Sequence, residues 1–498
     1  MRNTIYLIMT IVLCIGLAFA QNNTASVQQI NGNNNQLDAT QTGSLNTATL
    51  TQDGNENLIG KPTETDAKGV VQEGNENTIN VLQQGDRNII QQYRPEKNVF
   101  NSLYQKGDKN LFDIQQLGND NVIGQGSYPY HGIEQVGNLN NAYFIQDGDR
   151  NKIGRFHQND ELNEARISQL GNDNVVDGAA QIILGTGPAA NYLEINQSGN
   201  GNVVSQAHQE GVSIEGYIDQ TGDNNRASLE LSRTDAFGDI DQVGDRNKAT
   251  VSVWKSGIGD RNSGVISQTG NDNEASQYVR SHSSVSHDNE MVTVQTGDQN
   301  YAYTHIKGSE NLAQISQDGN ENDAKIEQEG ENNNHGTWHN AGYVTIEQTG
   351  NLNDAQLKQN GSDNEEIIIQ RGNENSAILQ VNGNNGLGII QQYPGGSNHN
   401  MAKIIATGDY TRHYAIQFSG SYNEIDMQQN GDGNYSYIYQ RNGDENSAIA
   451  TQSGIDNDIT VTQQDGNLNI SNISQQGNLH QSTVTQTGSG NFSKIIQN

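Results

Sequence analysis

Small or apolar residues alternate with polar residues in short segments that recur along the chain. In residues 46–52, Ala48 and Leu50 alternate with threonines, and Asn46 and Gln52 flank them in the same parity. The pattern Asn-x-Ala-x-apolar-x-Gln also begins at Asn140, Asn163, Asn322, Asn353 and Asn446. Successive side chains of a β-strand point to opposite faces. The alternation therefore predicts strands of about six residues whose apolar and amide side chains share one face.

A turn signal follows each of these segments. The last Gln begins the string Gln-x-Gly-x-x-Asn, as in residues 52–57, and the residue after Gly is commonly Asn or Asp. Glycine together with Asn or Asp permits the positive φ angles that a tight bend needs. The chain is therefore predicted to run strand, turn and strand again, which is a β-arc.

The string Gln-x-Gly-x-x-Asn occurs 23 times between Gln41 and Asn491. Its copies start about 11 or about 22 residues apart, which predicts an all-β, amyloid-like β-solenoid of stacked strand-turn-strand repeats, with about 11 residues per arm and about 22 per coil. Between residues 41 and 169 the motifs repeat in pairs at 31, 33, 30 and 34 residues, which leaves three-sided coils as an alternative. Two arms per coil are preferred throughout.

Glutamine and asparagine occupy the inward positions, where a lone buried amide would be costly. In an in-register stack each amide can bond to the copies above and below, because it carries both donors and an acceptor. The predicted structural site is therefore a set of amide ladders with their turn glycines. Its representative members are Gln41, Gly43, Asn46, Gln52, Gly54, Asn57, Gln135, Gly137, Asn140, Gln146, Gln317, Gly319, Asn322, Gln328, Gln348, Gly350, Asn353, Gln359, Gln486, Gly488 and Asn491.

Three segments are predicted along the chain. Residues 1–20 have the apolar run and the Ala18-Phe19-Ala20 cleavage pattern of a signal peptide. Residues 21–40 carry a degenerate repeat, and residues 41–498 form the repeat solenoid. Irregular or inserted stretches are expected near 58–71, 178–191, 276–291 and 381–416. Proline cannot donate to a strand ladder, and the five prolines all fall where the motif fails: Pro62, Pro95, Pro129, Pro188 and Pro394.

Composition narrows the class of protein. Only 32% of the residues are hydrophobic and the mean hydropathy is -0.78, which is too little apolar surface for conventional cores. Such a composition also fits disorder, but a disordered chain has no reason to keep a fixed spacing. The net charge of -31 argues against binding nucleic acid or anionic membrane.

The segment after the signal peptide has no stretch long and apolar enough for membrane insertion. The single cysteine, Cys14, lies within the signal peptide, so no disulfide is predicted in the exported chain. Backbone pairing and stacking must therefore hold the fold together.

No non-repeating group of catalytic residues is found, so neither an enzyme activity nor a catalytic, cofactor or metal site is predicted. His335 and His339 have the spacing of a helical metal pair, yet Gly336 and the strand context remove the helix. The Gly-Asn-x-Asn and Gly-Asp-x-Asn turns carry oxygen ligands for Ca²⁺, but ordinary turn chemistry accounts for them better.

The repeat resembles that of the curlins, the bacterial subunits of curli amyloid fibres, whose repeat resembles Ser-x5-Gln-x-Gly-x-x-Asn-x-Ala-x3-Gln. In this chain the Ser position is usually Asn, the repeats are more numerous than in a typical curlin subunit, and the loops are longer. The portion from the first Gln to the last is matched in full at residues 41–52, 135–146, 317–328 and 348–359.

The resemblance implies a secreted structural subunit that self-assembles into curli-like functional amyloid fibres of the extracellular matrix and supports adhesion and biofilm formation. The partners it implies are further copies of the chain, a nucleator subunit and an outer-membrane secretion pore of the curli type. The location it implies is the surface of a Gram-negative bacterium. A monomeric β-solenoid adhesin or carbohydrate-binding protein is the alternative, and a β-helical polysaccharide-processing enzyme is a more distant one.

Overall fold

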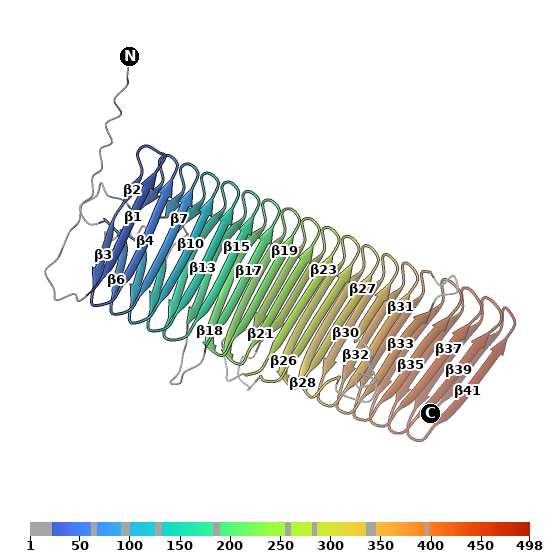
Figure 1. Ribbon diagram of the computed structural model, residues 1–498. Helices are drawn as coiled ribbons and strands as arrows, with labels where there is room; N and C mark the ends of the chain where they lie inside the picture. The colour runs from blue at the N-terminus through green and yellow to red at the C-terminus, as the bar shows by residue number, and fades with distance from the viewer. Residues whose placement is uncertain are drawn as a thin grey trace, which may run out of the picture. The chain divides into compact units, whose positions relative to one another are not determined.

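The computed structural model describes residues 22–60, 67–90, 100–124, 132–182, 190–253, 260–280, 286–334, 345–393 and 398–498 (Figure 1). The described residues form β-strands and turns, with no helix among them. They fall into two compact units, Met1–Ser213 and Ile214–Asn498. The predicted signal peptide, the five prolines, His335 and His339 lie outside the described residues.

The first unit has two parallel sheets, and each coil contributes one arm to each sheet. Sheet A contains β1 Thr24–Ile30, β4 Thr47–Asp53, β7 Thr78–Gln84, β10 Leu111–Leu117, β13 Asn141–Asp147, β15 Glu164–Leu170 and β17 Tyr192–Ser198. Sheet B contains β2 Gln36–Leu37, β3 Ala39–Thr42, β5 Leu58–Ile59, β6 Ala67–Glu73, β8 Ile89–Ile90, β9 Phe100–Lys106, β11 Val122–Ile123, β12 Ile133–Val136, β14 Lys152–Asn159, β16 Val175–Ile182 and β18 Val203–Val212.

The second unit repeats this arrangement. Its sheet A contains β19 Glu215–Thr221, β21 Phe237–Val243, β23 Ser263–Thr269, β25 Glu290–Thr296, β27 Leu312–Asp318, β29 Ile346–Thr349, β31 Glu365–Arg371, β33 Leu387–Tyr393, β35 Arg412–Phe418, β37 Tyr435–Arg441, β39 Asp458–Gln464 and β41 Gln481–Thr487. Its sheet B contains β20 Arg226–Thr234, β22 Lys248–Val253, β24 Glu274–Val279, β26 Tyr301–Ser309, β28 Asp323–Glu331, β30 Asp354–Asn360, β32 Ser376–Asn382, β34 Met401–Thr407, β36 Glu424–Asn430, β38 Ser447–Ser453, β40 Ile470–Gln476 and β42 Phe492–Gln497.

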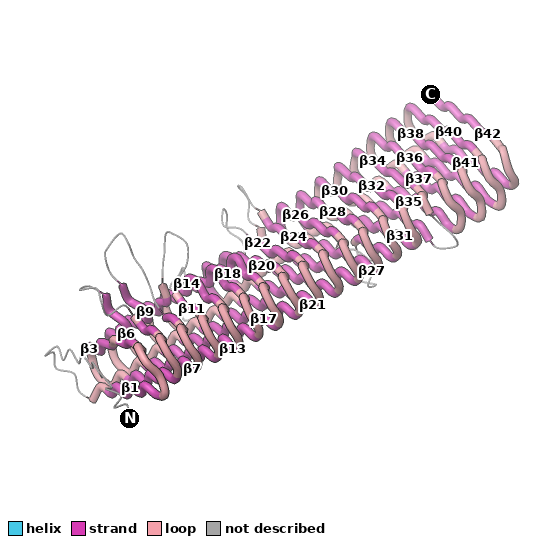
Figure 2. Tube along the Cα trace, turned by 90° about the horizontal axis from the view of Figure 1, so that it is seen from above, coloured by secondary structure: helices cyan, strands magenta, loops and turns pink. Residues whose placement is uncertain are grey.

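Each strand pairs in parallel with the strand one coil later, and equivalent repeat positions align. Gln52 of β4 aligns with Gln83 of β7, which aligns with Gln116 of β10. The tube view shows the chain turning between the two sheets at every coil (Figure 2). The shortest coils of the second unit advance 22 residues, as from Gln295 to Gln317. The predicted β-solenoid of about 22 residues per coil is therefore confirmed.

The two-residue alternation places one face of each strand inside the stack, except at the terminal strands β1, β2, β3 and β42, which have no buried residue. In β30, Ala355, Leu357 and Gln359 are buried, whereas Asp354, Gln356 and Lys358 face outward. The first unit adds three fully buried aromatic rings, Phe112, Phe144 and Phe156. The rings of Phe144 and Phe156 meet edge to face with centroids 4.8 Å apart, a geometry worth about 0.5 to 1.5 kcal/mol beyond burial.

In the longer coils of the first unit, the described residues form an interrupted arm and no third side. The two residues of β11 pair with the start of β14, and β12 pairs with the end of the same strand, with Ile133 opposite Phe156. Strands β11 and β12 are thus two halves of one arm, separated by residues 124–132. Two arms per coil are confirmed and the three-sided alternative is wrong, because the extra residues interrupt an arm without changing the columns on either side.

Regular strands also occupy most of the stretch 381–416, so the expectation of irregular structure is wrong for its described part. Strands β33, β34 and β35 pair in parallel with their neighbours, although Ala406 stands where the motif has Gln. The turn needs its glycine and not the glutamine, since Gly408 keeps a φ of 129°. Residues 61–66, 183–189 and 281–285, in the other three stretches, lie outside the described residues.

Candidate functional site

A column of buried glutamines runs through sheet A of each unit. In the second unit, each Nε2 donates to the Oε1 of the glutamine one coil later over 2.7 to 3.0 Å, which is good hydrogen-bond geometry. The members are Gln220, Gln242, Gln268, Gln295, Gln317, Gln348, Gln370, Gln392, Gln417, Gln440, Gln463 and Gln486. In the first unit the column begins at the exposed Gln29 and continues through the buried Gln52, Gln83, Gln116, Gln146, Gln169 and Gln197.

In sheet B, the column that corresponds to the ladder glutamine has different residues in the two units. The first unit has a continuous ladder of Gln41, Gln72, Gln105, Gln135, Gln158, Gln181 and Gln209. In the second unit the column begins as Leu231, Val253, Val279 and Ile306, becomes Gln328 and Gln359, changes to Val381 and Ala406, and ends as Gln429, Gln452, Gln475 and Gln497. The aliphatic residues from Leu231 to Ile306 explain why the sheet B arms of these coils lack the Gln-x-Gly-x-x-Asn string.

The asparagines form a different kind of ladder from the one expected. The Oδ1 of Asn322 accepts the backbone N–H of Asn353 at 3.1 Å, and its Nδ2 donates to the carbonyl of Gly350 at 2.7 Å. Amide-to-amide bonds also occur, as from Asn353 Nδ2 to Asn322 Oδ1 at 3.0 Å. The shorter Asn side chain thus reaches the backbone of the next turn. The other sequence-predicted asparagines also bond to the next or the preceding coil, along their respective columns: Asn46, Asn57, Asn140, Asn353 and Asn491.

The turn glycines stack closely. Gly319 has a φ of 131°, and a Cβ built on it would lie 1.9 Å from the carbonyl oxygen of Gly350. The predicted Gly43, Gly54, Gly137 and Gly350 are equally tight, whereas Gly488 has nothing within 4 Å. The second positive φ belongs to the residue before Asn, such as Leu352 at 57°, and not to the Asn or Asp after Gly. That Asn or Asp instead accepts a backbone N–H from the preceding coil, as Asn351 does from Asn320 at 2.8 Å.

A pair of buried ionisable residues lies beside the gap in the sheet B ladder. Glu366, Gly388 and His413 occupy one inward column of sheet A on successive strands. His413 Nδ1 contacts Gln429 Oε1 at 2.7 Å, so Nδ1 carries the proton because that oxygen can only accept. Both carboxyl oxygens of Glu366 and Nε2 of His413 have no hydrogen-bond partner among the described residues.

Burial governs the titration of both groups. It raises the pKa of the Glu366 carboxyl well above its usual value, and the charge of Glu365 adds to the shift. Burial lowers the pKa of His413 to about 4, against the opposing effect of its bond to Gln429. In both groups burial thus favours the neutral form over the charged one. Sequence reasoning missed this pair, although Glu366 stands at an inward position of the strand alternation.

We expect Glu366→Gln to stabilise the chain at pH 8, by on the order of 1 kcal/mol or more, and to change little near pH 4. The folded-state pKa lies above the unfolded value of about 4.5, so protonated Glu366 favours folding below that pH, and its contribution is lost as the pH rises towards the folded pKa. Urea unfolding at pH 4, 6 and 8 measures the difference. The control is Glu290→Gln on the exposed face of β25, and an equal gain at pH 4 would contradict the titration argument.

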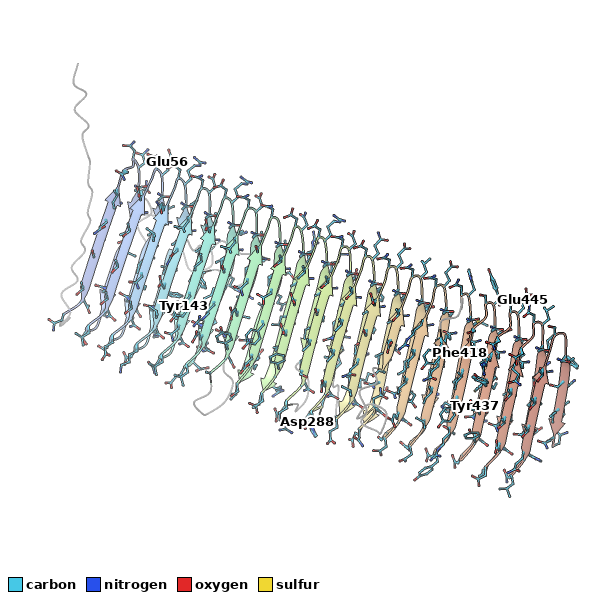
Figure 3. All side chains as sticks on the ribbon, turned by 45° about the vertical axis from the view of Figure 1, so that its right-hand side comes forward. Glu56, Tyr143, Asp288, Phe418, Tyr437 and Glu445 are labelled. Atoms are coloured by element: carbon cyan, nitrogen blue, oxygen red, sulfur yellow. The ribbon has the colours of Figure 1, made fainter. Side chains whose placement is uncertain are left out.

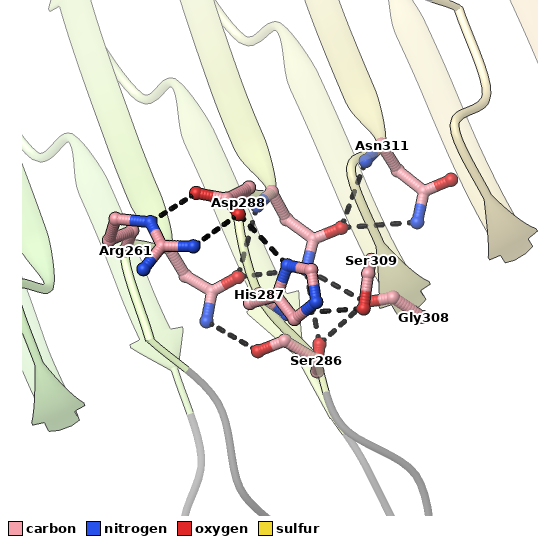
Figure 4. Close-up of polar contacts among 9 residues, drawn as sticks. Arg261, Ser286, His287, Asp288, Gly308, Ser309 and Asn311 are labelled. Carbon is pink, nitrogen blue, oxygen red and sulfur yellow. Dashed lines mark hydrogen bonds and ion pairs between the residues drawn. The ribbon is translucent and has the colours of Figure 1, made fainter.

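The turn before β25 brings Ser286, His287 and Asp288 together (Figure 4). Arg261 binds the Asp288 carboxylate through two contacts of 2.6 and 2.7 Å, and His287 Nδ1 lies 2.9 Å from the same carboxylate. The Ser286 hydroxyl, however, is buried and donates to the carbonyl of Gly308 at 2.7 Å. This serine is engaged in holding the turn, so the three residues do not form a nucleophile, base and acid relay.

Among the described residues, no group of three or more His, Cys, Asp or Glu side chains could hold a metal ion. The same residues include no helix long and apolar enough to cross a membrane. The exposed carboxylates that extend from the turns, such as Glu56 and Glu445, belong to the repeat (Figure 3).

Two parallel sheets with in-register amide columns define the protein as a laddered β-solenoid. A family model for the curlin associated repeat matches residues 32–60, 189–230, 287–319, 319–361 and 420–454. The resemblance to the curlin repeat is thereby confirmed in five regions of the chain, and together with the β-solenoid fold it supports a structural subunit of the curli type. No curated protein matches the chain.

Proposed function

We propose that the chain polymerises end to end into curli-like functional amyloid fibres of the extracellular matrix, where the fibres support adhesion and biofilm formation. The curlin repeat is a structural repeat, and its family suggests self-assembly at the cell surface. A nucleator subunit and an outer-membrane secretion pore are the further partners of this proposal. A monomeric adhesin is the alternative that the fibre experiment distinguishes.

The observation that carries the proposal is the match between two exposed strands. Strand β1 places Ala25, Val27 and Gln29 in the column positions that β41 fills with Ser482, Val484 and Gln486. The outer faces of both strands are exposed. A β1 strand from one copy therefore fits on β41 of another in the register of an internal pair.

The glutamine ladder has a direction, so its two ends present different hydrogen-bonding groups. Each Nε2 donates towards the higher-numbered glutamine, so Gln29 donates to Gln52 and Gln486 accepts from Gln463. At the β41 end the group directed outward is the Nε2 donor, and at the β1 end it is an Oε1 acceptor. The two ends are complementary to each other and not to themselves, which produces head-to-tail fibres.

We expect purified chain lacking residues 1–20 to form fibres that bind an amyloid dye and diffract near 4.7 and 10 Å. Val484→Asp should slow elongation at least tenfold, since it places a charge in the column against which β1 would pack. Thr485→Asp, which changes the outward neighbour, is the matched control. A persistently monomeric chain, or equal slowing by both variants, would contradict end-to-end growth through β41.

A further inference from the structure

An aromatic surface interrupts the polar outer face of sheet A in the second unit. Tyr414, Phe418, Tyr435, Tyr437 and Tyr439 occupy outward positions of β35 and β37, and all are partly or fully exposed. Tyr414 lies with its ring centroid 6.0 Å from Tyr435 and 6.1 Å from Tyr437, and Tyr437 stacks on Tyr439 at 6.4 Å. Figure 3 shows Phe418 and Tyr437 on the same part of this sheet. These five residues are called the tyrosine face.

The tyrosine face differs in charge from the rest of the chain. Strands β33, β35 and β37 contain no Asp or Glu, although the chain carries 58 acidic residues and a net charge of -31. Their charged side chains are Arg412 and Arg441, both exposed, of which Arg412 aligns with Tyr435 and Arg441 with Phe418. The nearest outward carboxylates on the flanking strands of the sheet are Glu365 of β31 and Asp458 of β39.

Aromatic rings beside arginines favour one chemical class of ligand. Aromatic rings offer flat apolar area at small cost in conformational entropy, and the tyrosine hydroxyl adds a polar group at the edge. The apolar C–H faces of sugar rings pack on such surfaces. Arginine binds carboxylates with paired hydrogen bonds, which a lysine cannot reproduce. A sugar polymer with carboxylate groups satisfies both parts of the surface.

We propose that the tyrosine face binds an acidic polysaccharide, with the rings of Tyr414, Tyr437 and Tyr439 under the sugars and Arg412 and Arg441 on the uronate carboxylates. The surface is part of one sheet within one unit. Binding therefore needs neither polymerisation nor a second copy, and the proposal goes beyond the fibre-forming function.

The chain offers a matched control surface. Tyr217 and Phe237 also face outward on sheet A of the second unit, with ring centroids 6.0 Å apart. Their outward neighbours are acidic instead of basic: Glu215, Asp219, Asp239 and Asp241. Ring contact is thus similar at the two places, while the sign of the nearby charge is opposite.

Affinity electrophoresis of the monomeric chain tests the proposal, in gels that contain alginate, a polyuronate, or neutral dextran at equal mass and without Ca²⁺. Wild type should be retarded by alginate, and Y414A/Y437A/Y439A should weaken the interaction about tenfold or more. R412Q/R441Q should also weaken it, and added salt should weaken wild type in the same way. Y217A/F237A should behave as wild type, and circular dichroism should show that every variant keeps its strands.

Each contrary result overturns the assignment. Equal retardation by dextran and alginate would remove the role of the arginines, and equal losses in the tyrosine variant and in Y217A/F237A would remove the role of this face. Retardation by DNA of matched charge, without retardation by alginate, would assign the surface to another class of polymer. Because the monomer is measured, failure here leaves end-to-end assembly untouched, and absence of fibres leaves this binding untouched.

Discussion

Gly350→Ala should prevent the second unit from folding stably, with a loss of about 3 kcal/mol or more from clash and backbone strain together. Gly350 has a φ of 114°, and a Cβ on it would stand 2.0 Å from the carbonyl oxygen of Gly372. Backbone atoms of two stacked turns cannot separate without breaking hydrogen bonds between coils, such as Gly372 N–H to Thr349 O at 2.9 Å. Urea unfolding followed by circular dichroism measures the loss.

Gly488→Ala is the control for that experiment. Gly488 has a φ of 84° but no atom within 4 Å of a built Cβ, so only backbone strain of about 1 to 2 kcal/mol remains. That strain falls on the turn between the exposed strands β41 and β42, where it should hardly move the midpoint of unfolding. Equal destabilisation by the two alanines would show that positive φ, and not the stacking of turns, is what requires glycine.

Interrupting the sheet A glutamine ladder should produce the second large effect. Gln317 and Gln348 are adjacent members of the longest ladder, bonded at 2.8 Å, and both are buried. Each substitution by alanine should cost about 1 to 3 kcal/mol, because the neighbouring amides lose a partner in a buried site. Q317A/Q348A should therefore slow fibre growth and lower the denaturant midpoint more than either single change does.

The second sheet supplies a comparison for the ladder. Gln328 and Gln359 form a column of only two glutamines at 2.6 Å, with aliphatic residues in the coils on either side, and Gln359 also donates to Asn334 at 2.9 Å. Because Q328A/Q359A does not interrupt a longer ladder, it should slow fibre growth less than Q317A/Q348A does. Outward neighbours such as Glu327 and Lys358 form exposed ion pairs, whose loss is worth about 1 kcal/mol or less. Equal effects from inward and outward changes would show that backbone strand pairing, and not the glutamine ladder, stabilises the stack.

The sequence predicted the solenoid because the same few residue types serve strand, turn and ladder at a fixed spacing. Ala355, Leu357 and Gln359 face inward for reasons that act within one strand. The number of sides was ambiguous, since a chain alone does not show that β11 and β12 pair with one strand. Only the register of Val122 and Ile133 on β14 settles that the intervening residues interrupt an arm.

The gaps in the sheet B glutamine column could not be predicted from the sequence. Val253 or Ala406 at a Gln position reads as loss of the repeat, although an aliphatic column also fills the interior when several coils change together. Glu366 was missed because its place opposite the ladder gap depends on how the two sheets face each other. The close stacking of Gly319 on Gly350 likewise follows from the coil spacing and not from the turn sequence alone.

The interrupted arms of the first unit show how a β-solenoid tolerates inserted residues. Strands β5 and β6, β8 and β9, and β11 and β12 resume their register after the residues between them, so the length between two halves is uncoupled from the rise of the coils. A foreign peptide grafted between Ile123 and Ile133 would therefore occur once in each subunit, at the same position along the stack. Grafts in all three arms would form a row at intervals of about 4.8 Å, a density of display set by the backbone itself.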